Sequence, residues 1–297
     1  MKRFNLHSHS LFCDGKSSLE QMVCAAIEKG FYCFGFSAHA PVPFENNFAL
    51  PFSDIQSYLD ETHRLKEKYQ SKIRLYTSME FDYITDIAED AKQRAKDMGL
   101  DYVLASVHQV KQRGKEGVWF IDGGKQEVWD KGLEACFGGD VRKGVECFYS
   151  QSIEMLQKVN PDVICHFDKV KMHNKERFFS EKDAWYKELV RTLLEQIKTQ
   201  DCICEVNTRG LYKGRSNDFF PSLVWIKEAA QMGIRMTIST DCHNASEVDL
   251  YFDEAVEDLQ QCGHRCVWGF DGHWQGDNLP SLQITVRGLA FVGVQPG

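Results

Sequence analysis

The sequence lacks the features that mark membrane and secreted proteins. No apolar run approaches the roughly 20 residues that a membrane-spanning helix needs. Residues 1–7 contain no apolar h-region, so we expect no signal peptide. The 11 cysteines, an odd number, include no CxxC pair, which favours reduced thiols over a disulfide framework. These absences predict a cytoplasmic protein with no membrane partner.

The sequence also contains fewer basic than acidic residues. Lys and Arg number 35 against 43 Asp and Glu, and the formal net charge is -8. Because nucleic-acid backbones are bound by Lys and Arg, we expect no nucleic-acid partner. A small anionic substrate remains compatible, since a few local cations or metal ions reverse the field inside a pocket.

Short β-type runs alternate with amphipathic helical stretches along the chain. The expected strands are Arg3–Leu6, Phe31–Ser37, Ile73–Met79, Tyr102–Val107, Val163–Cys165, Ile203–Val206 and Arg235–Ser239, with a weaker one at Cys266–Trp268. The expected helices are Ser18–Lys29, Asp54–Tyr69, Asp86–Met98, Asp140–Val159, Lys182–Lys198, Ser222–Met232 and Ser246–Gln261. Strands that alternate with helices run parallel, which predicts an α/β protein with a closed (β/α) barrel, a doubly wound open sheet being the alternative.

No linker, internal repeat or low-complexity tract interrupts this pattern. A length of 297 residues suits one barrel-type domain, so we predict a single catalytic domain over residues 1–297. The part from about residue 273 to residue 297 is expected to be a tail of unknown role. The sequence does not indicate the oligomeric state.

Histidines gather where the expected strands end. Six of the ten lie at, or within about two residues after, a strand's C-terminal end: His7, His9, His39, His108, His166 and His243. Three carboxylates occupy similar places: Asp14, Glu80 and Asp241. In a parallel barrel these ends open on the same face, where catalytic residues lie, whereas core histidines would scatter over strands and helices.

One histidine at a strand end is more often structural, but six on the same predicted rim indicate metal ligands. Nine donors exceed the needs of one divalent ion, so two or three metal ions are expected. Imidazole with carboxylate suits Zn, Fe or Mn. By contrast, His63 lies on a charged helical face and His264 follows a helix-ending glycine, and both are expected to be structural.

The ordered motifs resemble those of the PHP (polymerase and histidinol phosphatase) phosphoesterases over about residues 3–272. The motifs are His7-Ser8-His9, Asp14-Gly15, Ser37-Ala38-His39-Ala40-Pro41, Glu80, Ser106-Val107-His108, His166-Phe167-Asp168 and Ser239-Thr240-Asp241-Cys242-His243. The resemblance implies a distorted (β/α)7, TIM-like barrel with three divalent metal ions at the C-terminal ends of the strands. Ala38 departs from the family pattern, because many relatives have Asp before this histidine.

The resemblance also implies an order of ligation. The first ion would take His7, His9, Glu80 and Asp241, the second Glu80, His108 and His166, and the third Asp14, His39 and His243. A hydroxide held between two ions would attack phosphorus, so Glu80, Asp241 and His243 are expected to act in catalysis through the metals. Asp168 is expected to orient His166.

Segments between these motifs resemble the histidinol-phosphate phosphatase branch of the family. They include Trp119-Phe120-Ile121-Asp122, Glu205-Val206-Asn207-Thr208 and Phe220-Pro221-Ser222. The resemblance implies hydrolysis of the small phosphomonoester L-histidinol phosphate to L-histidinol and phosphate, a step of histidine biosynthesis. The alternatives are another small phosphomonoester, a nucleotide substrate, or a barrel that serves only as a binding module.

Residues that would contact the substrate are less well defined. Where relatives have a Gly-Leu-Arg run after the asparagine, this chain reads Arg209-Gly210-Leu211-Tyr212-Lys213. The phosphate-binding cation is therefore Arg209, Lys213 or Arg215. We expect Asp122 and Glu205 to bind the amine of the substrate, and Trp119 or Phe120 to contact its imidazole.

Overall fold

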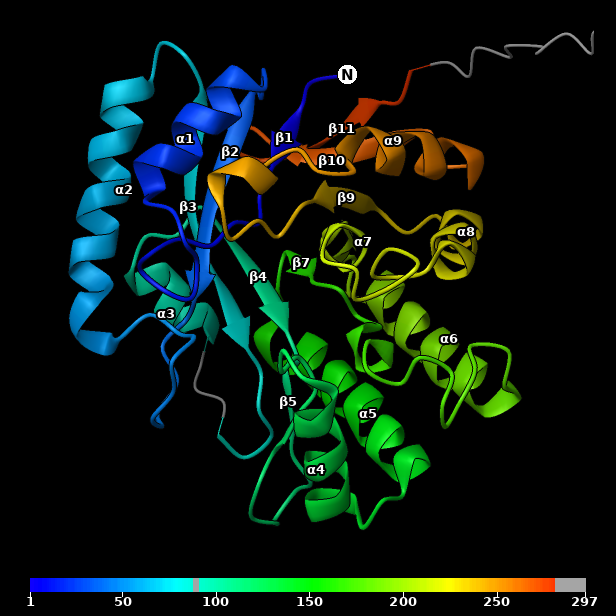
Figure 1. Ribbon diagram of the computed structural model, residues 1–297. Helices are drawn as coiled ribbons and strands as arrows, with labels where there is room; N and C mark the ends of the chain where they lie inside the picture. The colour runs from blue at the N-terminus through cyan, green and yellow to red at the C-terminus, as the bar shows by residue number, and fades with distance from the viewer. Residues whose placement is uncertain (88–90, 281–297) are drawn as a thin grey trace, which may run out of the picture.

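The computed structural model describes residues 1–87 and 91–280 (Figure 1). Seven parallel strands form its main sheet, and every neighbouring pair runs in the same direction. In spatial order the strands are β1 (Phe4–Asn5), β2 (Cys33–His39), β3 (Arg74–Asp82), β4 (Tyr102–Ser106), β7 (Val163–Ile164), β8 (Ile203–Asn207) and β9 (Met236–Ser239). All seven expected barrel strands are present, with their ends shifted by up to three residues.

The sheet curves into a nearly closed barrel with a seam between β1 and β9. Within the described residues, the backbone bridge between these edges is Ser8 to Cys242, next to a hydrogen bond from the His9 amide to the Cys242 carbonyl at 2.8 Å. The buried side chain of Asn5 spans the seam and donates to Thr240 Oγ1 at 2.6 Å. The expectation of a distorted TIM-like barrel is confirmed, and the open doubly wound sheet is not found.

Each strand of the main sheet is followed by a helix that packs on the outside of the barrel (Figure 1). These helices are α1 (Leu19–Glu28), α2 (Ile55–Tyr69), α3 (Ala91–Asp97), α5 (Val141–Val159), α6 (Ala184–Thr199), α8 (Leu223–Met232) and α9 (Phe252–Gln261). Helix α2 illustrates the pattern, since Tyr58, Thr62 and Leu65 are buried at helical spacing while its charged residues face outward. No helix in the described ranges is both long and apolar enough to cross a bilayer.

Several local features differ from the sequence-based expectation, among them three that concern helices. Helices α4 (Gln126–Phe137) and α7 (Arg209–Tyr212) were not expected at all. The helix expected over Ser246–Gln261 is divided into a 3-10 turn at Ala245–Glu247 and α9, because Tyr251 adopts a positive φ of 59° between them.

The interior of the barrel is packed with strand residues that leave little room. A Cβ atom on Gly35 of β2 would lie 1.9 Å from the hydroxyl of Tyr102, which donates to the Leu6 carbonyl at 2.6 Å. Glycine is therefore required at this position, because any side chain would displace the tyrosine that ties β4 to the chain just before His7.

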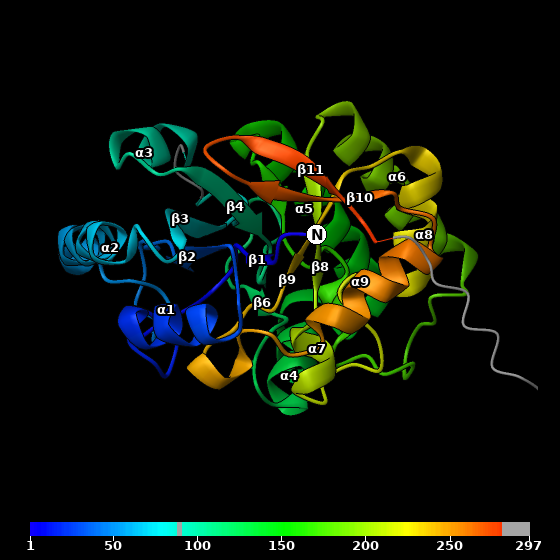
Figure 2. The same cartoon turned by 90° about the horizontal axis from the view of Figure 1, so that it is seen from above.

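A hairpin covers the N-terminal end of the barrel. Strands β10 (Cys266–Phe270) and β11 (Trp274–Asn278) pair antiparallel, and Figure 2 shows them crossing this end. The Phe270 ring packs against Tyr76 and Tyr102, with centroids 4.8 and 5.3 Å away. The expected tail from about residue 273 is thus corrected, since Trp274–Asn278 is a paired strand; residues 281–297 lie outside the described ranges.

Candidate metal centre

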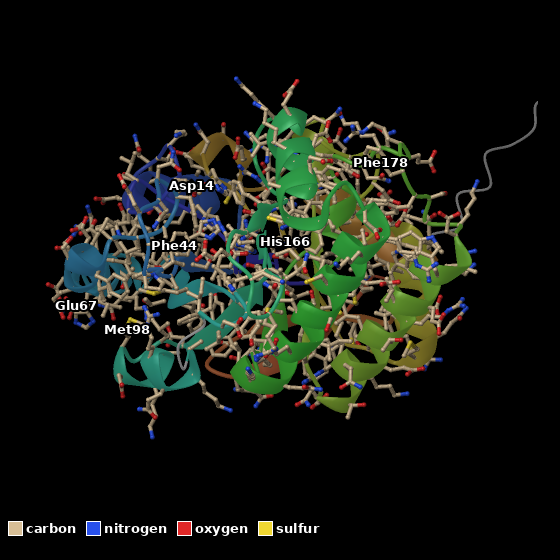
Figure 3. All side chains as sticks on the ribbon, turned by 90° about the horizontal axis from the view of Figure 1, so that it is seen from below. Asp14, Phe44, Glu67, Met98, His166 and Phe178 are labelled. Carbon is tan, nitrogen blue, oxygen red and sulfur yellow. The ribbon has the colours of Figure 1, made fainter. Side chains whose placement is uncertain are left out.

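The nine side chains predicted as metal ligands lie on the face opposite the hairpin, where the strands end (Figure 3 views this face, with His166 labelled near its middle). Four of them come two residues after a strand: His7 after β1, His108 after β4, His166 after β7 and Asp241 after β9. The parallel register also places His39 of β2 beside Glu80 of β3. Eight of the nine are buried and Asp14 is partly exposed.

Backbone turns at two strand ends direct ligands into the barrel mouth. His166 and Asp241 have positive φ values of 29° and 47°, which non-glycine residues rarely adopt. Such conformations persist only where the surrounding structure enforces them, and they concentrate at functional sites.

The nine side chains form overlapping groups. Ligand atoms of His9, Asp14, His39 and His243 all lie within 4.8 Å of one another, as do those of His7, His9 and Asp241, and those of His39, Glu80 and His108. The two oxygens of Glu80 face different partners, since Oε2 lies 3.2 Å from His7 Nε2 and Oε1 lies 3.0 Å from His166 Nε2. Glu80 is thus placed as a carboxylate shared between two neighbouring groups.

These residues fit divalent cations. Imidazole nitrogens and carboxylate oxygens are suitable donors for Zn, Fe or Mn. Asp14 Oδ1 is buried, and no hydrogen-bond partner for it is found among the described residues. Burial by itself would raise the pKa of Glu80, but the neighbouring His7 and His39 lower it well below its ordinary value, so the carboxylate is ionised. Buried carboxylates in a ring of imidazoles need positive charge between them.

Two further carboxylates orient His7 and His108 by binding the ring nitrogen Nδ1, which is not the nitrogen that faces the cluster. Glu205 Oε1 lies 2.6 Å from His7 Nδ1, and its other oxygen accepts the His166 amide at 3.0 Å. Asp82 accepts a short hydrogen bond from His108 Nδ1. Each acceptor leaves Nε2 of its histidine free to face the cluster, as is usual around metal-binding histidines.

These contacts correct the role predicted for Glu205 and reveal a role for Asp82 that the sequence analysis missed. Glu205 was expected to read the substrate amine, but its side chain is 1% exposed and is occupied by His7. Asp82 was not singled out, although it follows Glu80 by two residues on β3 and therefore lies on the same side of that strand.

A cavity of about 480 Å³ opens over the cluster. Its lining includes Asp14, His39, Glu80, His108, Asp241 and His243 of the predicted ligands, together with five cations: Lys16, Lys169, Arg209, Lys213 and Arg215. Arg209 donates to the Asp241 carbonyl at 2.9 Å, while Lys213 forms a short ion pair with Glu247. Arg215 lies 3.6 Å from Asp122. All three residues proposed as the phosphate-binding cation therefore reach the same cavity.

The aromatic wall of the cavity is Phe120, not Trp119. Trp119 is fully buried, donates to the Trp129 carbonyl at 2.9 Å and packs on Phe137. Neighbouring residues of a strand point to opposite sides, so only one residue of β6 (Trp119–Phe120) can face the cavity. Phe120 does so and stacks on Phe48, with ring centroids 6.2 Å apart.

The stretch after His166 contains one wrong assignment and one omission. Asp168 accepts the Ser222 amide at 3.0 Å and pairs with Lys171 at 2.6 Å, so it does not orient the His166 ring as expected. Burial raises the pKa of Asp168 to about 6. Lys169 was overlooked, yet it lines the cavity with its ammonium 2.9 Å from Asp122 and 3.4 Å from His108 Nε2.

Comparison with known proteins identifies the family. A family model described as PHP domain matches residues 5–209, from the first barrel strand to the arginine at the cavity. The chain belongs to the PHP domain family. The match covers well over half of the chain and includes seven of the nine predicted ligands.

Curated relatives of this PHP domain protein cover nearly its full length. A protein of Schizosaccharomyces pombe named "Probable histidinol-phosphatase" is 29% identical over 97% of this chain and 96% of the relative. The histidinol-phosphatase of Bacillus subtilis is 24% identical over 86% of this chain and 99% of the relative.

A solved structure has the same fold. Histidinol phosphate phosphatase from Lactococcus lactis, complexed with Zn, L-histidinol and phosphate, superposes with a TM-score of 0.67. It is 20% identical in sequence, and the match covers 92% of this chain and 99% of that chain.

Proposed function

We propose that this PHP domain protein is a metal-dependent phosphomonoester hydrolase whose substrate is L-histidinol phosphate. The observation that carries the proposal is a cluster of nine His, Asp and Glu side chains, six of which line a cavity that five cations also line. The names of the two curated relatives support the substrate, since both are called histidinol-phosphatases.

Three divalent ions would be held by this chain. The proposed sets are His7, His9, Glu80 and Asp241; Glu80, His108 and His166; and Asp14, His39 and His243. When bound, such ions would neutralise charge on the phosphoryl oxygens and activate water as the nucleophile. The protein's own contribution is to orient the imidazoles through Glu205 and Asp82.

The cavity walls suit the two ends of the substrate. Arg209 is held rigidly by the Asp241 carbonyl and by Tyr212, so its guanidinium is prepared to bind phosphate oxygens. Phe48 and Phe120 offer flat apolar surfaces on which an imidazole ring would stack. Phosphate would therefore lie over the metal cluster and the imidazole near the aromatic wall.

The chemistry of the cysteines supports a cytoplasmic location for this activity. All 11 cysteines are free thiols, including Cys204 and Cys242 in the barrel core. Free thiols in this number are typical of a reducing compartment.

A steady-state assay tests the proposed substrate. L-histidinol phosphate, p-nitrophenyl phosphate and a nucleoside monophosphate would be compared with the metal-loaded enzyme. We expect kcat/KM to favour L-histidinol phosphate by roughly 10²–10⁴-fold, because binding groups at the far end of the substrate add discrimination. Equal turnover of all three compounds would contradict the histidinol assignment, and no turnover of any would contradict phosphomonoester hydrolysis.

A further inference from the structure

Lys169 has an unusual place for a lysine. Its side chain is 4% exposed, and its ammonium lines the cavity beside the predicted ligands. The residue opens the 3-10 turn Lys169–Lys171, and its amide donates to the His166 carbonyl at 2.9 Å. The backbone that positions Lys169 is therefore continuous with the backbone that positions His166.

The Lys169 ammonium has one carboxylate within ion-pair distance, and that carboxylate is shared with another cation. Asp122 Oδ2 lies 2.9 Å from Lys169 Nζ, but the same carboxylate also faces Arg215 at 3.6 Å. On its other side the ammonium is 3.4 Å from His108 Nε2, the nitrogen that faces Glu80. A cation this close to a metal-binding nitrogen is repelled by any metal ion, unless an anion lies between the two charges.

The neighbouring lysine shows what a purely structural ion pair looks like in the same segment. Lys171 lies 2.6 Å from Asp168 and 3.4 Å from Glu181. Its ammonium thus lies between two carboxylates, and Lys171 is not among the residues that line the cavity over the metal cluster. Lys169 has one carboxylate within ion-pair distance, shares it with Arg215 and lines the cavity over the cluster. The two lysines therefore differ in their close anionic partners.

We propose that Lys169 is a further catalytic residue, which contacts a phosphoryl oxygen of the substrate at the cavity wall beside the metal cluster, and that Asp122 is the positioning residue that holds its ammonium there. The phosphate dianion supplies further negative charge beside both Lys169 and the cluster. As negative charge on the phosphoryl oxygens is redistributed in the transition state, a fixed ammonium at this distance stabilises it. This assignment rests on the proposed phosphomonoesterase function, and it replaces the expectation that Asp122 reads the substrate amine.

The test compares two lysine variants of the metal-loaded, full-length enzyme. Lys169→Met removes the ammonium and keeps most of the side chain, and Lys171→Met makes the same change two residues away. Binding of inorganic phosphate is measured by titration calorimetry, kcat/KM is measured with L-histidinol phosphate and p-nitrophenyl phosphate, and metal content is determined for each protein.

For Lys169→Met we expect inorganic phosphate to bind roughly 10- to 100-fold more weakly at unchanged metal content, because a charge-assisted contact is lost. We expect kcat/KM to fall by roughly 10²-fold, and equally for both substrates, since both share the phosphate group. Lys171→Met should lower the melting temperature and leave phosphate affinity unchanged. Wild-type phosphate affinity in metal-replete Lys169→Met would overturn the proposal.

Asp122→Asn tests the pair without altering the lysine. A positioning role predicts that this variant weakens phosphate binding less than Lys169→Met does, and that the double variant is no worse than Lys169→Met alone. A loss confined to L-histidinol phosphate, with normal phosphate binding, would show that Asp122 reads the amine instead. Because phosphate binding needs no turnover, this experiment stays decisive even if the wild-type enzyme fails to hydrolyse L-histidinol phosphate.

Discussion

The two ends of the barrel are formed by the same strands but bury different kinds of side chain. At the N-terminal end, Tyr102 begins β4 and packs against Phe270 and Trp274 of the hairpin. At the C-terminal end, His108 follows the same strand and enters a cluster of imidazoles and carboxylates. One end buries aromatic surface, and the other buries groups that can carry charge.

This difference separates stability from chemistry within the fold. Burying an aromatic side chain contributes roughly 1.5–3 kcal/mol, so the hairpin end stabilises the barrel without help from any ligand. Buried carboxylates and closely spaced histidines oppose folding unless they are neutralised. The ligand end therefore depends on bound cations, and changes at the two ends should have separable effects.

Removal of the metals should have the largest effect on the ligand end. Dialysis against a strong chelator is expected to abolish hydrolysis and to lower the melting temperature, because ions that bind the folded state stabilise it. Elemental analysis of protein purified without chelator should find two to three equivalents of Zn, Fe or Mn, as the nine donors require. Full activity with one equivalent or less would contradict a multinuclear centre.

Glu80→Gln should be the most damaging single substitution at that end. Each Glu80 oxygen faces a different histidine, so the change disturbs two groups of ligands together. We expect kcat to fall roughly 10³-fold or more, with reduced metal content. His63→Ala serves as the control, because this histidine lies on the exposed face of α2. Greater damage from His63→Ala than from Glu80→Gln would mean that the cluster is wrongly assigned.

Glu205→Gln should have an intermediate effect. The amide keeps the size of the side chain but weakens its bond to His7 Nδ1, so His7 is held less firmly. Loss of such an orienting partner typically reduces metal affinity or activity 10- to 100-fold, and we expect roughly that range here. Metal titration of the apoprotein measures it, and a selective loss with L-histidinol phosphate alone would restore the amine-binding role.

Phe270→Ala should have the smallest effect on activity, although it removes a large side chain. Phe270 packs against Tyr76, Tyr102 and Trp274 at the hairpin end. We expect a loss of about 3–5 kcal/mol in the free energy of unfolding, measured by urea denaturation. Below the unfolding transition, kcat/KM should stay near wild type. A large drop in kcat/KM of the folded variant would show that the two ends are coupled.

Much of the barrel could be predicted from the sequence because its signals are local. Strand and helix periodicity indicated seven parallel strands, and the positions of His39, His108 and Asp241 relative to those strands indicated a single rim. The hairpin partner Trp274–Asn278 was missed because it is polar and short, and only pairing with β10 makes it a strand. Helix α4 was also missed, although Trp129, Leu133 and Phe137 recur at helical spacing.

The side chains that pair with the ligands and with Lys169 could not be predicted, because these pairs join residues far apart in the chain. Glu205 and His7 are separated by 198 residues, and Asp122 and Lys169 come from different loops. Asp122 and Glu205 were correctly expected near the site, yet both have partners that the sequence does not reveal. Asp168 was assigned to His166 because it is near in sequence, whereas the fold pairs it with Lys171.

The sequence by itself therefore indicated parallel strands and the side chains that follow them, since both come from periodicity along single strands. The distorted seven-stranded barrel was implied by the family resemblance. Only the tertiary structure decided which way those side chains face and with which groups they pair. It buries Trp119 and exposes Phe120 to the cavity, and it places Lys169 in the cavity lining while Lys171 pairs with Asp168. The physical reason is that these choices depend on the closure of the barrel, which brings residues into contact that no local pattern relates.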